Sequence, residues 1–178
     1  MAIKTFTTGE VLTAADTNTY LANSGLVYIA SGSLSGTSTT FTNCFSSTYN
    51  NYRIVVRVSG TVGNNIYLKW NGSTGSTYNS NGFYSIVGGA TNYGGFEQNT
   101  AGGINCGYTP SAGFTSLQVD ITAPFLAEQT GLSCQTSGNP YSGLWNGIDT
   151  NAASSTNLTI ACGVSMTGTA TIYGYRKA

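Results

Sequence analysis

The sequence contains no histidine and very few charged residues. Charged side chains make up 7% of the chain and the formal net charge is zero, whereas about 25% is usual in a globular domain. Without histidine, the commonest general base and metal ligand is missing, and a Ser-His-Asp triad is excluded. Only six Lys and Arg residues are present, so the clustered cations that bind phosphate are missing too. We therefore expect no enzymatic activity, no cofactor and no nucleic-acid partner.

The remaining charges suggest few sites. Arg53, Arg57 and Lys69 are the nearest approach to a basic patch, and Arg53 and Arg57 fit one face of a strand, where a solvated face is the favoured interpretation. Paired carboxylates are the remaining hydrolytic option. The candidates lie in different predicted elements and are Glu97, Asp120, Glu128 and Asp149. The sequence does not pair them.

A calcium site is a further option, because Asp149 is close in sequence to Asn146 and Asn151 and backbone carbonyls add further oxygen ligands. A turn is the favoured role of Asp149.

Long apolar runs are also missing. No stretch approaches the 18 or so residues of a membrane helix, and residues 1–10 lack the apolar centre of a signal peptide, so we expect synthesis in the cytoplasm and no membrane insertion. Four cysteines are present, none in a C-x-x-C pair: Cys44, Cys106, Cys134 and Cys162. Without histidine or a secretory signal, free and mostly buried thiols are favoured over zinc ligands or disulfides.

Short alternating segments rich in aromatic and β-branched residues predict an all-β protein. Aromatics reach 12% of the chain, which argues against disorder despite the abundance of Gly, Ser, Thr and Asn. Tyr52 to Val58 is the strongest strand, with alternate residues suited to opposite faces. The predicted strands are 26–29, 38–45, 52–58, 65–70, 83–87, 93–98, 116–122, 132–136, 144–148, 158–162 and 169–175. Turn residues between them indicate an antiparallel β-sandwich, jelly-roll-like, or a barrel.

Two long polar stretches, 71–82 and 137–157, are predicted to be exposed loops, where binding residues commonly lie. Aromatic rings near such loops are candidates for stacking on sugars or partner proteins. The principal candidates are Trp70, Tyr78, Tyr141 and Trp145, with Tyr84 and Tyr93 nearby. For each, packing in the core or at a subunit interface is the alternative and favoured role.

The first 25 residues differ from the rest and are predicted to form an attachment or oligomerisation segment, followed by a β-sandwich domain over 26–178. Thr13 is a candidate N-cap and Gly25 a stop for a short helix. A two-turn helix is marginal alone, so it must pack against the domain or another chain. The candidate attachment residues are Phe6, Val11, Leu12, Tyr20 and Leu21.

The two ends of the chain also resemble those of known proteins. Residues 6–21, FTTGEVLTAADTNTYL, and residues 168–176, GTATIYGYR, are similar to the first and last segments of tailed-phage virion proteins, including those of cyanophages, which are tail-fibre-like or head-decoration-like. Residues 52–56 resemble their first core strand in style. The resemblance implies a virion location, a homotrimer in contact with other virion proteins, and no catalytic residues.

Three functions remain open from the sequence. The first is a trimeric tail-fibre or fibre-like surface appendage, with host-surface glycan as a candidate contact. The second is a capsid decoration protein that stabilises the phage head. The third is a carbohydrate-binding β-sandwich lectin. The end segments favour the first two, and the fibre-like N-terminus favours the first.

Overall fold

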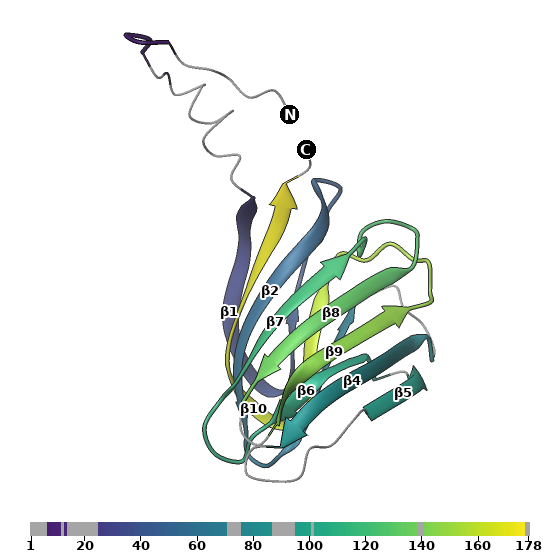
Figure 1. The fold of residues 1–178 in the computed structure, drawn as a ribbon. Coiled ribbons are helices and arrows are strands. Elements are labelled where there is room, and N and C mark those ends of the chain that lie inside the picture. Colours follow the sequence, from purple (N-terminus) through teal and green to yellow (C-terminus); the bar gives the residue numbers. More distant parts are fainter. Residues whose placement is uncertain are drawn as a thin grey trace.

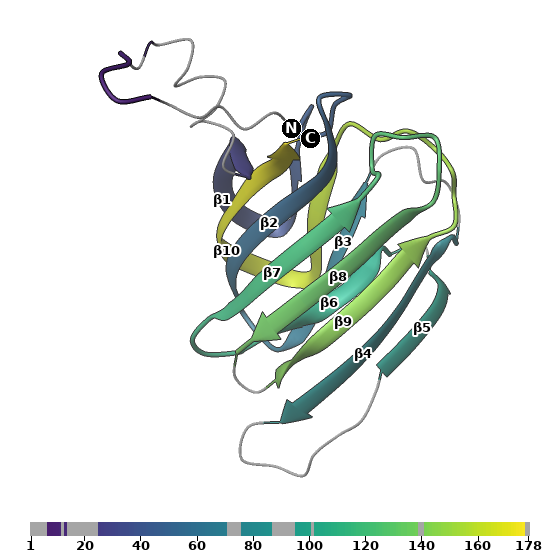
Figure 2. The same cartoon turned by 45° about the horizontal axis from the view of Figure 1, so that its top comes forward.

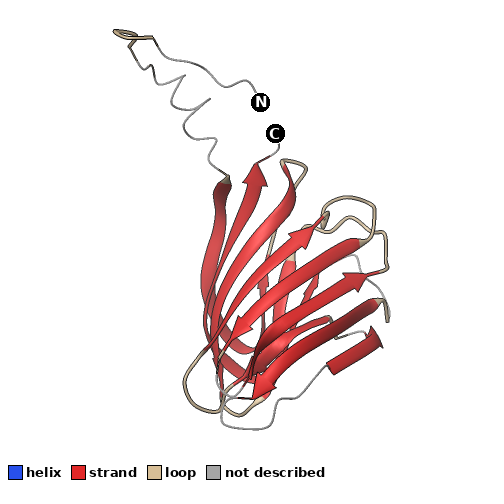
Figure 3. Ribbon diagram, viewed as in Figure 1, coloured by secondary structure: helices blue, strands red, loops and turns tan. Residues whose placement is uncertain are grey.

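The computed structural model describes residues 7–11, 13, 25–70, 76–86, 95–100, 102–138 and 141–176. Within these ranges every regular element is a strand, which confirms the predicted all-β antiparallel sandwich (Figures 1 and 3). No helix in the described part of the chain has the length and hydropathy to cross a membrane. The short helix predicted after Thr13 lies outside the described residues.

Ten strands form the fold in the described part of the chain: β1 Leu26–Phe41, β2 Tyr49–Gly60, β3 Asn64–Trp70, β4 Tyr78–Ile86, β5 Gly95–Thr100, β6 Ile104–Thr109, β7 Thr115–Thr122, β8 Thr130–Ser137, β9 Tyr141–Asp149 and β10 Leu158–Arg176. They are linked in the order β5-β4-β9-β8-β7-β2-β10-β3-β6, and β1 pairs with β10. All the pairings are antiparallel.

Strands β1 and β10 turn the corner between two layers. The first part of β10 pairs with β3, and from Met166 onward it pairs with β2 instead. Strand β1 follows β10 through this corner with a register shift between Gly36 and Ser38, and Gly36 has a φ of 65°, which suits glycine. The large layer therefore contains β10, β2, β7, β8, β9, β4 and β5, while β3 and β6 lie behind it (Figure 2).

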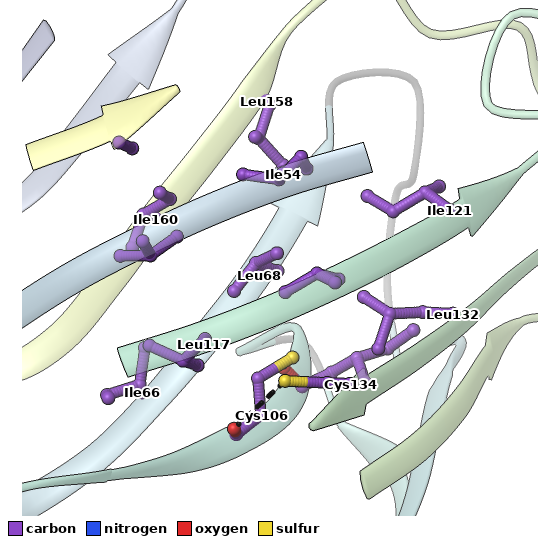
Figure 4. Packing of buried hydrophobic residues seen from close by; sticks show 14 of the residues in the cluster. Ile54, Ile66, Leu68, Cys106, Leu117, Ile121, Leu132, Cys134, Leu158 and Ile160 are labelled. Carbon is purple, nitrogen blue, oxygen red and sulfur yellow. Dashed lines mark hydrogen bonds between the residues drawn. The ribbon is translucent and has the colours of Figure 1, made fainter. Parts of the chain in front are cut away.

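The core lies between the layers and follows the predicted alternation. Tyr52, Ile54, Val56 and Val58 are buried and the residues between them face outward. Buried branched side chains from both layers meet in the middle of the sandwich (Figure 4). The strands over 52–58, 65–70, 116–122 and 132–136 are thus confirmed.

Several predicted boundaries were wrong. Segments 26–29 and 38–45 belong largely to one strand, β1, and segments 158–162 and 169–175 are both part of β10. The polar residues between them face solvent from within a strand rather than forming turns. The predicted loop 71–82 contains the first part of β4, and the predicted loop 137–157 contains all of β9. Strand β6 was missed because Asn105 and Gly107 interrupt its apolar pattern.

Three loops close the end of the sandwich at which β1 begins and β10 ends. The main-chain nitrogen of Phe45 in the β1–β2 loop donates to the carbonyl of Thr156 in the β9–β10 loop (3.0 Å). Ser155 of that same loop donates to Pro124 in the β7–β8 loop (2.9 Å). Three neighbouring loops are therefore tied together, and Phe45 and Ser155 are buried beneath them.

Candidate binding site

Three of the four aromatic candidates lie in the core and not on the surface. Trp70, Tyr78 and Trp145 have only 3%, 3% and 6% of their surface exposed. The ring of Tyr78 meets that of Trp70 edge to face, with centroids 5.4 Å apart. These rings face inward because their strands alternate in phase with the buried positions. The structure therefore agrees with core packing, the role favoured from the sequence, and does not place these three rings for contact with a glycan or partner.

Tyr141 is half-buried at the start of β9, in a row of rings. Its ring meets Tyr84 at 5.2 Å and Tyr108 at 4.8 Å, both edge to face. Tyr84 in turn stacks on Trp145 at 5.6 Å. Tyr141 therefore packs against two other rings and is only partly available for contact. Tyr93 lies outside the described residues.

Four of the five attachment candidates lie outside the described residues: Phe6, Leu12, Tyr20 and Leu21. Val11 is described and is 78% exposed. It follows a turn in which Glu10 donates its main-chain N–H to the Thr7 carbonyl (3.0 Å). Their role in attachment stays a prediction.

The cations do not form a patch. Arg53 and Arg57 share the outer face of β2, as expected, but Lys69 faces outward from β3 in the other layer. The guanidinium of Arg57 lies 3.5 Å from the ring centroid of Phe114, a cation–π contact. The favoured interpretation of a solvated face therefore agrees with the geometry.

Asp149 has a structural role. It is 1% exposed, and its carboxylate accepts hydrogen bonds from the Trp70 indole (2.9 Å) and the Asn151 main chain (3.0 Å). Asn146 is exposed on the opposite side of β9, three positions earlier. The two side chains do not converge, which argues against the calcium alternative. Asp149 ends β9, and its hydrogen bond with the main chain two residues on is typical of a turn residue. Among the described residues, no cluster of three or more acidic or cysteine side chains could hold a metal ion.

All four cysteines are buried and unpaired, as predicted. Burial raises the pKa of the Cys44 thiol to about 11. Burial also raises the pKa of the Cys106 thiol. Cys134 faces Cys106 in the core, and its thiol donates a hydrogen bond to the Cys106 carbonyl (3.4 Å; Figure 4). Such thiols are poor nucleophiles and metal ligands because the thiolate is disfavoured.

A charged cluster joins three strands on the outer face of the large layer. Arg53 on β2 lies directly opposite Asp120 on β7 and donates two hydrogen bonds to its carboxylate, from Nε (2.9 Å) and Nη2 (2.7 Å). The Tyr175 hydroxyl of β10 donates to the same carboxylate (2.6 Å). These hydrogen bonds, chiefly those from Arg53, lower the pKa of Asp120, while partial burial and then Asp120 raise the pKa of Tyr175.

This cluster forms one wall of an open pocket of about 340 Å³. The pocket crosses four strands, and its principal lining side chains are Arg53, Asp120, Gln118, Ser133, Gln135, Leu144 and Asn146. It is hollow because the small Ser133 lies in register between Asp120 on β7 and Asn146 on β9.

Most of these side chains were not identified from the sequence as site residues. Gln118 and Asp120 are outward positions of β7, as alternation along the predicted strand 116–122 implies. Ser133, Gln135 and Asn146 are outward positions of β8 and β9, and only the register between strands brings them beside Asp120. Alternation along β7 therefore indicated the face of Gln118 and Asp120, and the structure alone placed the other three side chains beside them.

Comparison of the chain with protein-family models and with curated proteins found no match.

Proposed function

We propose that the protein is a non-enzymatic structural component of a tailed-phage virion, a homotrimeric tail-fibre or fibre-like appendage. Its N-terminal segment attaches to other virion proteins or to neighbouring subunits, and its β-sandwich projects outward. The proposal places no catalytic step on any residue.

The placement of the chain ends carries this proposal. β1 begins beside the end of β10, where the Arg176 main chain donates to the Gly25 carbonyl (3.1 Å; Figure 1). The three tied loops already close this end of the sandwich, so the body has its own core there. A segment that leaves from a closed end is suited to reaching another chain, while the opposite end of the sandwich points away from the attachment.

The sequence supports the same role. Residues 6–21 and 168–176 resemble the end segments of phage virion proteins, and the second of these forms the last part of β10, paired with both β1 and β2. The described carboxylates of Asp120 and Asp149 are engaged in structural contacts, which suits a passive assembly component.

Labelling of intact phage particles tests the proposal. An antibody against the β-sandwich should label the tail, and quantitative mass spectrometry should find tens of copies per particle. Hundreds of copies spread over the head would favour the capsid decoration alternative. Absence of the protein from purified particles would refute both.

A further inference from the structure

The pocket on the outer face of the large layer has features that the proposed attachment role does not require. Ser133 forms its hollow centre, and the side chains of Gln118 and Gln135 lie directly opposite one another at its border. A volume of about 340 Å³ falls within the range of small-molecule sites.

The pocket presents amide groups that are free to bind. Gln118, Gln135 and Asn146 are exposed, and in the described part of the chain none of their side chains has a hydrogen-bond partner. Each amide has two N–H donors and a carbonyl acceptor. Together they match a ligand whose groups both donate and accept, as hydroxyl groups do.

The charges of the pocket cancel. Arg53 and Asp120 pair through two hydrogen bonds, and Asp120 accepts a third from Tyr175. An anion would have to compete with Asp120 for the guanidinium, and a cation would have to compete with Arg53 for the carboxylate. A neutral ligand does not have to compete with either charged group.

An apolar surface borders the amides. Leu144 lines the pocket and is 57% exposed, and Phe83, directly opposite it on β4, is 62% exposed. Exposed apolar groups beside unpaired polar ones suit a ligand with one C–H face and hydroxyl groups at its edge. A pyranose ring has this shape.

We propose that this pocket binds a neutral saccharide, with the amides of Gln118, Gln135 and Asn146 hydrogen-bonded to its hydroxyl groups and one ring face on Leu144 and Phe83. The site goes beyond the virion role and does not depend on it. It also differs from the aromatic contacts predicted from the sequence.

Saturation-transfer NMR on the full chain tests the site, with maltose, cellobiose and N,N′-diacetylchitobiose as neutral probes and a hyaluronan disaccharide as the anionic one. We expect transfer to at least one neutral probe. Gln118→Ala with Gln135→Ala should weaken binding by about tenfold or more, the loss expected for two hydrogen bonds. No transfer to any neutral probe, or transfer to the anionic probe alone, would overturn the proposal.

Ser133→Trp fills the hollow and should abolish binding. Ser137→Trp is the matched control, because Ser137 is exposed on the same face of the same strand but does not line the pocket. Equal binding by the two tryptophan variants would refute the site. If the parent chain binds no sugar, and light scattering shows that Ser133→Trp alone changes the mass of the assembly, this face instead contacts a second copy of the chain. That outcome would overturn the saccharide site.

Two further comparisons are needed. The first distinguishes a surface glycan from a free saccharide as the ligand, and the second distinguishes failure of the sugar site from failure of the virion role. Retention on amylose, cellulose or chitin beads, reversed by the matching disaccharide, would identify a surface glycan, and binding of the disaccharide without retention would identify a free saccharide. Either result supports the site. A chain that joins particles but binds no neutral sugar refutes the site alone, and a chain that binds sugar but is absent from particles refutes the virion role alone.

Discussion

The Tyr52 hydroxyl holds the β1–β2 loop at the closed end of the sandwich, and Tyr52→Phe tests that contact. Tyr52 is fully buried, and its hydroxyl accepts from the Ser46 N–H (2.8 Å) and donates to the Ser46 carbonyl (3.0 Å). The phenylalanine ring keeps the contacts with Phe45 and Tyr49. The variant therefore removes hydrogen bonds while leaving the packing in place.

The magnitude follows from the burial of the loop. A buried donor or acceptor that loses its partner costs about 1–3 kcal/mol. Because Ser46 is only half-buried, water can reach it in part, and we expect a loss of about 1–2 kcal/mol in the free energy of unfolding. This corresponds to a fall in Tm of about 2–8 °C for a chain of this size.

Urea unfolding followed by tryptophan fluorescence measures this loss, since both tryptophans are buried. Tyr28→Phe is the control. Tyr28 is 60% exposed and bonds to Ser31 at the surface (3.0 Å), so its loss should be below about 0.5 kcal/mol. If Tyr52→Phe unfolds at the same urea concentration as Tyr28→Phe, the Tyr52 hydroxyl does not stabilise the β1–β2 loop.

Three further predictions concern attachment, pH and thiols. A chain that begins at Gly25 should keep a cooperative thermal transition but lose the trimer mass of three times 18.4 kDa; unfolding of this chain would show that the first segment belongs to the core. Asp120→Asn should remove a stabilisation of less than about 1 kcal/mol, small because the ion pair is partly exposed. Since the folded pKa of Asp120 is lowered, chiefly by Arg53, this stability is present at neutral pH and is lost as the pH falls through the folded pKa; a parent chain and variant with the same acid unfolding curve would contradict the ion-pair role. Ellman's reagent should react slowly with the native chain, because the thiols are buried and the pKa of Cys44 is about 11, and should titrate four thiols per chain in denaturant; fewer than four would show disulfides.

The sequence by itself determined the fold class and the faces of the best strands. Alternation over residues 52–58 and 116–122 predicted which side chains are buried, because a strand places successive side chains on opposite faces. Burial of the four cysteines also followed from their local setting. These features depend on neighbours along the chain, which a sequence displays directly.

Only the tertiary structure decided where strands continue and which side chains meet. The Ser-, Thr- and Gly-rich stretches of β1 and β10 resemble loops until pairing between the two strands satisfies their main-chain groups. Trp70 and Trp145 are close in sequence to the predicted loops, and only the structure shows that both rings are buried in the core. The contact of Arg53 with Asp120 joins residues 67 positions apart, and it exists because β2 and β7 pair in one register out of many that local sequence allows.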